Sequence, residues 1–182
     1  MRNALLVVLI SSWIPISAFA DSGRAPIWYY ENSKGRYTAE MSLKAEQDSY
    51  NEVTQGPVRS ELHIYKEAKG KFPKKATFVT QAVCESKREP PEHLSCDNSS
   101  GPFSRARYEF VEYYFREGHG YKKLKGNSAD KNTVSAGKKL IRAFEKVVAP
   151  SEFFGYSVFR CVIGCDGVET PHVMIEVHLT GD

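Results

Sequence analysis

Apolar and polar residues alternate with a period of two over several short segments of the chain, as they do in β-strands. The segment from Val173 to Leu179 is the most regular, with Val, Ile, Val and Leu at its odd-numbered positions. Because alternate side chains of a strand point to opposite faces, these residues predict a buried face. His172, Met174, Glu176 and His178 are then expected on a face exposed to solvent. Further strands are predicted within residues 37–43, 61–65, 76–83, 105–116, 121–124 and 156–163.

One segment has the period of a helix instead. Val134, Ile141, Phe144 and Val148 recur at helical spacing, and Leu140 and Val147 widen this apolar stripe. Thr133 or Ser135 can cap the start of the helix, and Pro150 ends it. The basic residues lie mostly off the apolar stripe. We therefore expect the helix to pack on a sheet, rather than to lie on a membrane surface.

These segments predict the α+β class: a mostly antiparallel, twisted β-sheet of about six or seven strands packed with one main α-helix. Residues 21–182 contain no long linker, low-complexity tract or convincing repeat, so we expect them to form a single domain. A chain of this length can bury a core of its own.

The first 20 residues have the pattern of a secretory signal peptide. Arg2 precedes a short apolar core from Ala4 to Ile10, and small residues lead to Ala20. The apolar core is shorter than the ~20 residues that a membrane-spanning helix needs. We expect cleavage after Ala20 and a periplasmic or secreted protein without a membrane span.

The chain has four cysteines, which is an even number in a compartment expected to be oxidising. Four cysteines allow three pairings, and the local one, Cys84–Cys96 with Cys161–Cys165, is the simplest. It would clamp two loops, so two disulfides complete the predicted fold. Pairing also removes the free thiolate that a cysteine nucleophile needs.

Charge and sequence motifs argue against three kinds of function: nucleic-acid binding, cofactor binding and metal binding. Loss of the leader removes Arg2 and no acidic residue, which leaves 24 basic and 22 acidic residues. This balance gives no reason to expect a nucleic-acid partner. No sequence fingerprint of a cofactor site or a catalytic motif is present, so no cofactor is expected. His172 and His178 would stand ~20 Å apart along one strand, so no metal site is expected either.

Binding residues are predicted around one turn. His119 lies between Gly118 and Gly120, a pattern typical of a hairpin tip, and a histidine there can enter a partner's cleft. Outward tyrosines beside arginines are typical of protein interfaces, although the same aromatic residues also suit packing within a sheet. In the predicted strand, Tyr108, Phe110 and Tyr114 face opposite to Val111, Tyr113 and Phe115. The candidate binding residues are His119, Tyr121, Arg105, Arg107 and Arg116.

Three functions fit this reading. In general type the chain is similar to small exported immunity and inhibitor proteins of bacteria, although it shares no motif with them. The first hypothesis is therefore a non-enzymatic protein that blocks another envelope-acting protein, such as a hydrolase. The turn at Gly118–Gly120, the Cys84–Cys96 loop and the Cys161–Cys165 hairpin are its candidate contact elements. The second is a hydrolase with scattered acid–base residues such as His119, and the third is an envelope module that binds a small ligand or a polymer.

Overall fold

The computed structural model of the chain describes residues 26–41, 58–66, 77–87, 93–97, 106–126 and 129–181. Within β3, β4 and β5 it describes only some of the side chains. The predicted signal peptide lies outside these residues and stays a prediction. The strands are β1 (Ile27–Asn32), β2 (Gly35–Met41), β3 (Val58–Lys66), β4 (Thr77–Lys87), β5 (His93–Asp97), β6 (Ala106–Glu117), β7 (Gly120–Lys125), β8 (Phe153–Ile163) and β9 (Val173–Leu179). The helices are α2 (Lys131–Phe144) and a short 3-10 helix, η2 (Pro150–Glu152).

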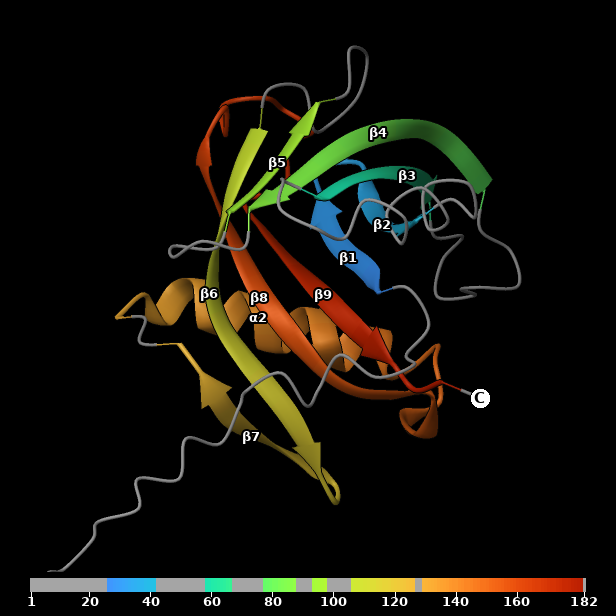
Figure 1. Cartoon of the computed structure of the whole chain (residues 1–182), viewed down its shortest axis with the longest axis vertical. Helices are drawn as coiled ribbons and strands as arrows, with labels where there is room; N and C mark the ends of the chain where they lie inside the picture. The colour runs from blue at the N-terminus through green and yellow to red at the C-terminus, as the bar shows by residue number, and fades with distance from the viewer. Residues whose placement is uncertain are drawn as a thin grey trace, which may run out of the picture.

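The strands form one antiparallel sheet that closes on itself. Their order is β5-β4-β3-β2-β1-β9-β8-β6-β7, and an additional pairing of β5 with the start of β6 completes a ring (Figure 1). Strand β7 stays outside this ring, and in the described part of the chain it pairs with the second half of β6. The predicted antiparallel sheet with one main helix is confirmed, but the sheet is a closed barrel with a hairpin attached.

The described residues form nine strands, where the sequence predicts about six or seven. The two additional ones are β1 and β5. The aromatic run of β1 lacks a period of two, because it is buried on both faces: Trp28, Tyr29 and Tyr30 are all buried. The sequence predicts a disulfide-closed loop between Cys84 and Cys96, whereas β5 forms there by pairing with β4 and β6.

Closure of the sheet buries both faces of its strands. One cluster, inside the barrel, contains Trp28, Tyr108, Phe159 and Met174 among others. The second lies between α2 and the outer face of β1, β6, β8 and β9. The expectation that Met174 shares a solvent-exposed face is therefore wrong, because that face of β9 lines the barrel and Met174 is fully buried.

Helix α2 confirms the predicted apolar stripe, but its cap differs from the prediction. Asp130 is the N-cap, and its carboxylate accepts a hydrogen bond from the backbone N–H of Thr133 at 3.0 Å. Thr133 and Ser135 instead lie inside the helix. Leu140, Ile141 and Phe144 are buried against the sheet.

A bulge in β6 changes which aromatic residues share a face. The register against β8 shifts between Phe110 and Glu112. Tyr108 and Phe110 therefore belong to the inner cluster, whereas Val111 and Tyr114 belong to the outer one. The predicted grouping of Tyr114 with Tyr108 is wrong, because a bulge adds one residue and reverses the alternation beyond it.

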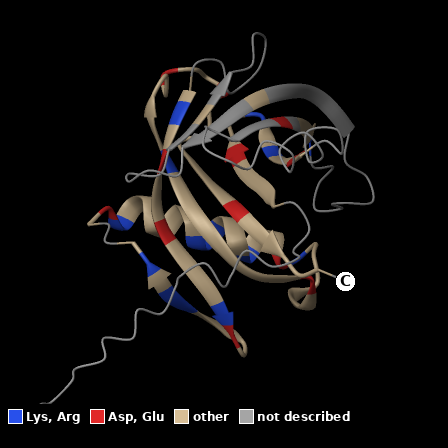
Figure 2. Cartoon of the chain, in the orientation of Figure 1, with Lys and Arg blue, Asp and Glu red and all other residues tan. Residues whose placement is uncertain are grey.

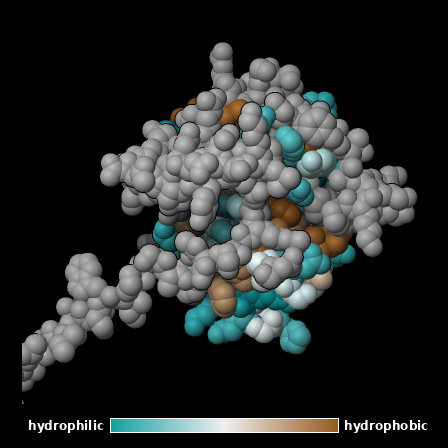
Figure 3. All heavy atoms as spheres, turned by 45° about the vertical axis from the view of Figure 1, so that its right-hand side comes forward, coloured by the Kyte–Doolittle hydropathy of each residue, from teal (hydrophilic) through white to brown (hydrophobic). Residues whose placement is uncertain are grey.

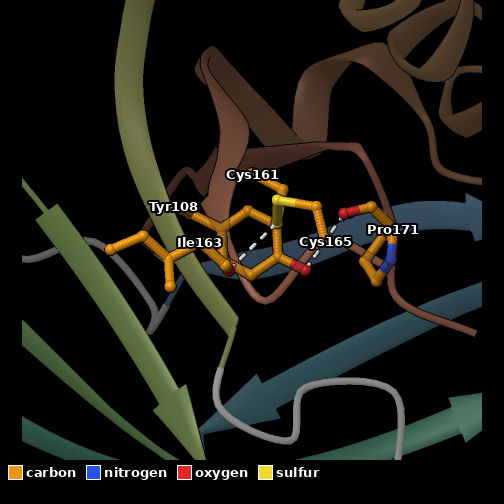
Figure 4. Close-up of a disulfide and its surroundings, with 5 residues drawn as sticks. All are labelled: Tyr108, Cys161, Ile163, Cys165 and Pro171. Atoms are coloured by element: carbon orange, nitrogen blue, oxygen red, sulfur yellow. Dashed lines mark hydrogen bonds between the residues drawn. A yellow bond between two sulfur atoms is a disulfide. The ribbon is translucent and has the colours of Figure 1, made fainter. Parts of the chain in front are cut away.

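One of the two predicted disulfides is described. Cys161 and Cys165 are bonded at the end of β8 and hold the start of the loop that leads to β9 (Figure 4). Beside them the Tyr108 hydroxyl donates to the Pro171 carbonyl at 3.0 Å and fastens β6 to the end of this loop. For the other pair, the backbone register places Cys84 opposite Cys96. Their side chains lie outside the described part of the chain, so this bond stays a prediction.

Candidate functional site

The hairpin of β6 and β7 is the first candidate site. Its strands close on the pair Glu117–Gly120, so the turn consists of Gly118 and His119. Gly118 has a φ of +59°, a conformation that glycine adopts at little cost. All four residues from Glu117 to Gly120 are exposed, and the hairpin extends beyond the barrel at the bottom of Figure 1. The structure therefore presents His119 at the tip of a projecting element.

The stem of this hairpin is fastened to the core. The Tyr121 hydroxyl donates to the Glu145 carboxylate at 2.6 Å, and its ring meets that of Tyr156 edge-on, with centroids 5.0 Å apart. Burial raises the pKa of Tyr121, and its hydrogen bond to Glu145 raises the pKa further. Arg116 donates to the Pro150 carbonyl and lies 5.4 Å from the centroid of the Phe153 ring. These contacts hold the hairpin in one orientation.

The five predicted binding residues do not form one patch. Tyr121 and Arg116 are partly buried in the stem, and Arg107 is partly buried at the opposite end of β6. Arg105 lies outside the described residues. Of the four that the structure describes, His119 alone is exposed. The other three were mispredicted as surface residues because the alternation of a strand gives the face of a side chain but not the element that covers that face.

Basic residues along β7 were not singled out from the sequence. Lys122, Lys123 and Lys125 are exposed, and Figure 2 shows the strand coloured mostly blue. Lys123 also lies 3.4 Å from the buried carboxylate of Glu112, which accepts a hydrogen bond from the Tyr114 hydroxyl. In Figure 3 the lower end of the molecule, where Figure 1 places this hairpin, is covered mainly by hydrophilic residues. The lysines at positions 122, 123 and 125 were the sequence feature from which this basic strand could have been predicted.

A second candidate site is a serine–histidine pair on the inner face of the sheet. Ser157 of β8 and His178 of β9 place Oγ and Nε2 3.0 Å apart. The ring of Tyr113 meets the imidazole edge-on at a centroid distance of 5.4 Å, and that of Phe154 lies 5.8 Å away. Burial lowers the pKa of His178 to about 4, so the imidazole is neutral at pH 7.

This pair has the polar groups of a nucleophile and its base, but its serine is buried and its imidazole is half-buried. Ser157 has only 6% of its surface exposed, and aromatic rings border the imidazole. Glu176 is the register partner of Ser157 and lies two residues before His178 on the same face of β9. The sequence did not indicate Ser157, because a single serine within an aromatic strand gives no signal of its partner on another strand.

A groove lies between α2 and the loop that joins β8 to β9. Its volume is about 600 Å³, and it also borders the β1–β2 turn. Leu140 and Val173 supply apolar lining, while Lys139, Glu31 and Asp166 add charges of both signs. The loop wall is held in place by the hydrogen bond of the Asn32 amide to the Glu169 carbonyl at 2.7 Å. The groove can admit a small molecule, but its mixed charges select no single class of ligand.

Within the described ranges, no group of three or more histidine, cysteine or acidic residues is placed to hold a metal ion. Among the same residues no helix has the length and apolar character needed to cross a membrane. Comparison of the chain with protein-family models, with curated proteins and with solved structures found no match.

Proposed function

We propose that this is an exported binding protein that blocks another protein of the cell envelope, with the β6–β7 hairpin as its contact element. The leader and the cysteines support export into an oxidising compartment. The observation that carries the proposal is the exposed tip from Glu117 to Gly120 on a stem fastened by Tyr121 and Arg116. A blocking protein needs this combination, because an element ordered before binding loses less conformational entropy when it enters a cleft.

The test uses the protein produced with its leader, so that export and disulfide formation occur. The exported protein is added to envelope extracts while their hydrolase activities are followed, and the proteins that it retains are identified by mass spectrometry. We expect one stoichiometric partner whose activity falls on addition. The variant His119→Asp replaces the imidazole at the tip with a carboxylate, and Lys131→Ala changes an exposed residue at the start of α2 as the control.

The two variants give separate outcomes. His119→Asp is expected to lose both retention and inhibition while its thermal unfolding stays as in the unchanged protein, and Lys131→Ala is expected to lose neither. Equal inhibition by both variants would remove the hairpin tip from the interface. Failure to inhibit any envelope activity, at low and moderate salt, would reject the blocking function itself.

The Ser157–His178 pair supports a hydrolase as the second candidate function. A neutral imidazole within hydrogen-bond reach of a serine hydroxyl is the arrangement that activates such a nucleophile. A fluorophosphonate probe that labels activated serines distinguishes this candidate. Labelling of the folded protein that disappears in Ser157→Ala would favour the hydrolase, whereas an unlabelled protein would leave Ser157 and His178 as core residues.

A further inference from the structure

The outer edge of β7 is the last edge of the sheet in the described part of the chain. Strand β7 ends the order of the nine strands, and its only described pairing is with β6. Strands at such an edge carry backbone N–H and C=O groups that another extended segment can pair with. The register of β7 determines which of its residues direct these groups outward, and its side chains determine what kind of segment can pair with them.

The register of the hairpin shows which backbone groups of β7 point away from β6. Glu117 and Gly120 close a two-residue turn and form a hydrogen-bonded pair, and hydrogen-bonded and non-hydrogen-bonded pairs then alternate. Phe115 with Lys122 is therefore the next hydrogen-bonded pair. Tyr121 and Lys123 lie at the non-hydrogen-bonded positions, so their N–H and C=O groups point away from β6, toward the open edge.

The side chains of β7 decide the kind of partner. Lys122 and Lys123 are adjacent in the strand, Lys125 follows after Leu124, and all three are exposed. Lysines on an edge strand oppose self-association, because a second copy would place like charges opposite one another. Lys123 also pairs with Glu112, and Lys125 lies 5.3 Å from the centroid of the Phe110 ring. Their exposed positive charge, together with that of Lys122, attracts a strand that carries carboxylates. Leu124, with 49% of its surface exposed, adds an apolar contact between them.

We propose that β7 binds an extended, acidic segment of a partner protein by strand addition, with backbone pairing at Tyr121 and Lys123. This proposal rests on the proposed function, since it describes how the hairpin holds its partner after the tip has engaged. The acidic residues of the segment lie opposite the lysines and set the register. Two outward residues offer up to four backbone hydrogen bonds, so the isolated interaction is weak, and strong binding requires the tip contact as well.

The experiment titrates the full exported protein with a blocked Glu-Val-Glu-Val-Glu-Val peptide, followed by backbone amide NMR and hydrogen exchange. We expect shifts along β7 that weaken as salt rises. Exchange is expected to slow at the amides of Tyr121 and Lys123, but to change little at Lys122, whose N–H already pairs with β6. A Lys-Val peptide of the same length is the charge control and is expected not to bind.

Two substitutions at one position test the backbone contact. Lys123→Pro removes an outward N–H without removing a β6–β7 hydrogen bond, and Lys123→Ala removes the same side chain but keeps the N–H. Both lose the ion pair with Glu112, so their difference isolates the hydrogen bond. We expect Lys123→Pro to bind the acidic peptide about tenfold more weakly than Lys123→Ala, the equivalent of one buried hydrogen bond.

Each result of these experiments either supports strand addition at β7 or overturns it. Equal affinity of the two variants, protection confined to the tip, or no binding of the acidic peptide up to millimolar concentration would overturn strand addition. So would binding to anionic lipid vesicles without binding to the peptide, which would make β7 a membrane contact. If Lys123→Pro disturbs the hairpin fold, the exchange pattern of the unchanged protein still decides. Inhibition of the envelope partner that persists in Lys123→Pro would reject strand addition while retaining the proposed function.

Discussion

Protonation of His178 is expected to weaken the fold as the pH falls from neutral to mildly acidic. In the unfolded chain this histidine has its ordinary pKa of 6.5, whereas burial beside Tyr113 and Phe154 lowers the pKa in the folded protein to about 4. Between these two pKa values the unfolded state binds the proton more readily than the folded state. The contribution of the neutral His178 to the free energy of unfolding is therefore complete above pH 6.5 and is lost as the pH drops toward 4. Between pH 7 and pH 4.5 the loss is about 2.5 kcal/mol.

The assay is urea unfolding of the exported protein at pH 7 and pH 4.5, followed by tryptophan fluorescence. Other titrating groups contribute to the pH dependence, so the comparison is with His178→Gln, which retains those groups. The stability lost between the two pH values is expected to be about 2.5 kcal/mol smaller in His178→Gln than in the unchanged protein. Ser157→Ala keeps the imidazole and is expected to retain most of the pH dependence, although it loses the 3.0 Å hydrogen bond.

An equal loss in the unchanged protein and in His178→Gln would refute the reasoning. It would mean that the imidazole takes up its proton as readily in the folded state as in the unfolded one. The rings of Tyr113 and Phe154 would then not keep water from the imidazole of His178.

Three further predictions concern packing, capping and cross-linking. Gly137→Ala is expected to lower the free energy of unfolding by about 1–3 kcal/mol, although alanine has the better helix propensity. The reason is that the new Cβ would lie 2.8 Å from a Val158 methyl carbon. Denaturant unfolding should show a smaller loss when Val158→Ala is added. Asp130→Ala is expected to cost about 1 kcal/mol in the same measurement, whereas Asp130→Asn retains the cap and should cost much less. Peptide mapping without reduction is expected to recover Cys84 linked to Cys96, since they are opposite in the backbone register, and a link from either to another cysteine would contradict that pairing.

Local patterns in the sequence predicted the elements that depend mainly on neighbouring residues. The alternation over residues 173–179 corresponds to β9, and the apolar stripe that ends near Val148 corresponds to α2 and the turn after it. Gly118 and Gly120 predicted the β6–β7 turn for the same reason, and of the two Gly118 has the positive φ that the turn requires. The expectation of one helix packed on an antiparallel sheet followed from these elements.

The tertiary structure sets the features that depend on distant residues: closure of the sheet, the bulge in β6 and the Ser157–His178 pair. Whether a face of β9 meets water or the barrel interior depends on β5 pairing with β6, which no local pattern records. The bulge near Phe110 depends on the register with β8, and it moved Tyr114 to the helix side. Ser157 and His178 are 21 residues apart and meet only because β8 pairs with β9. Neighbouring residues set the short-range conformations of this chain, because caps, turns and periodicity act within a few residues. The long-range pairing of strands set which side chains are buried, opposed or exposed.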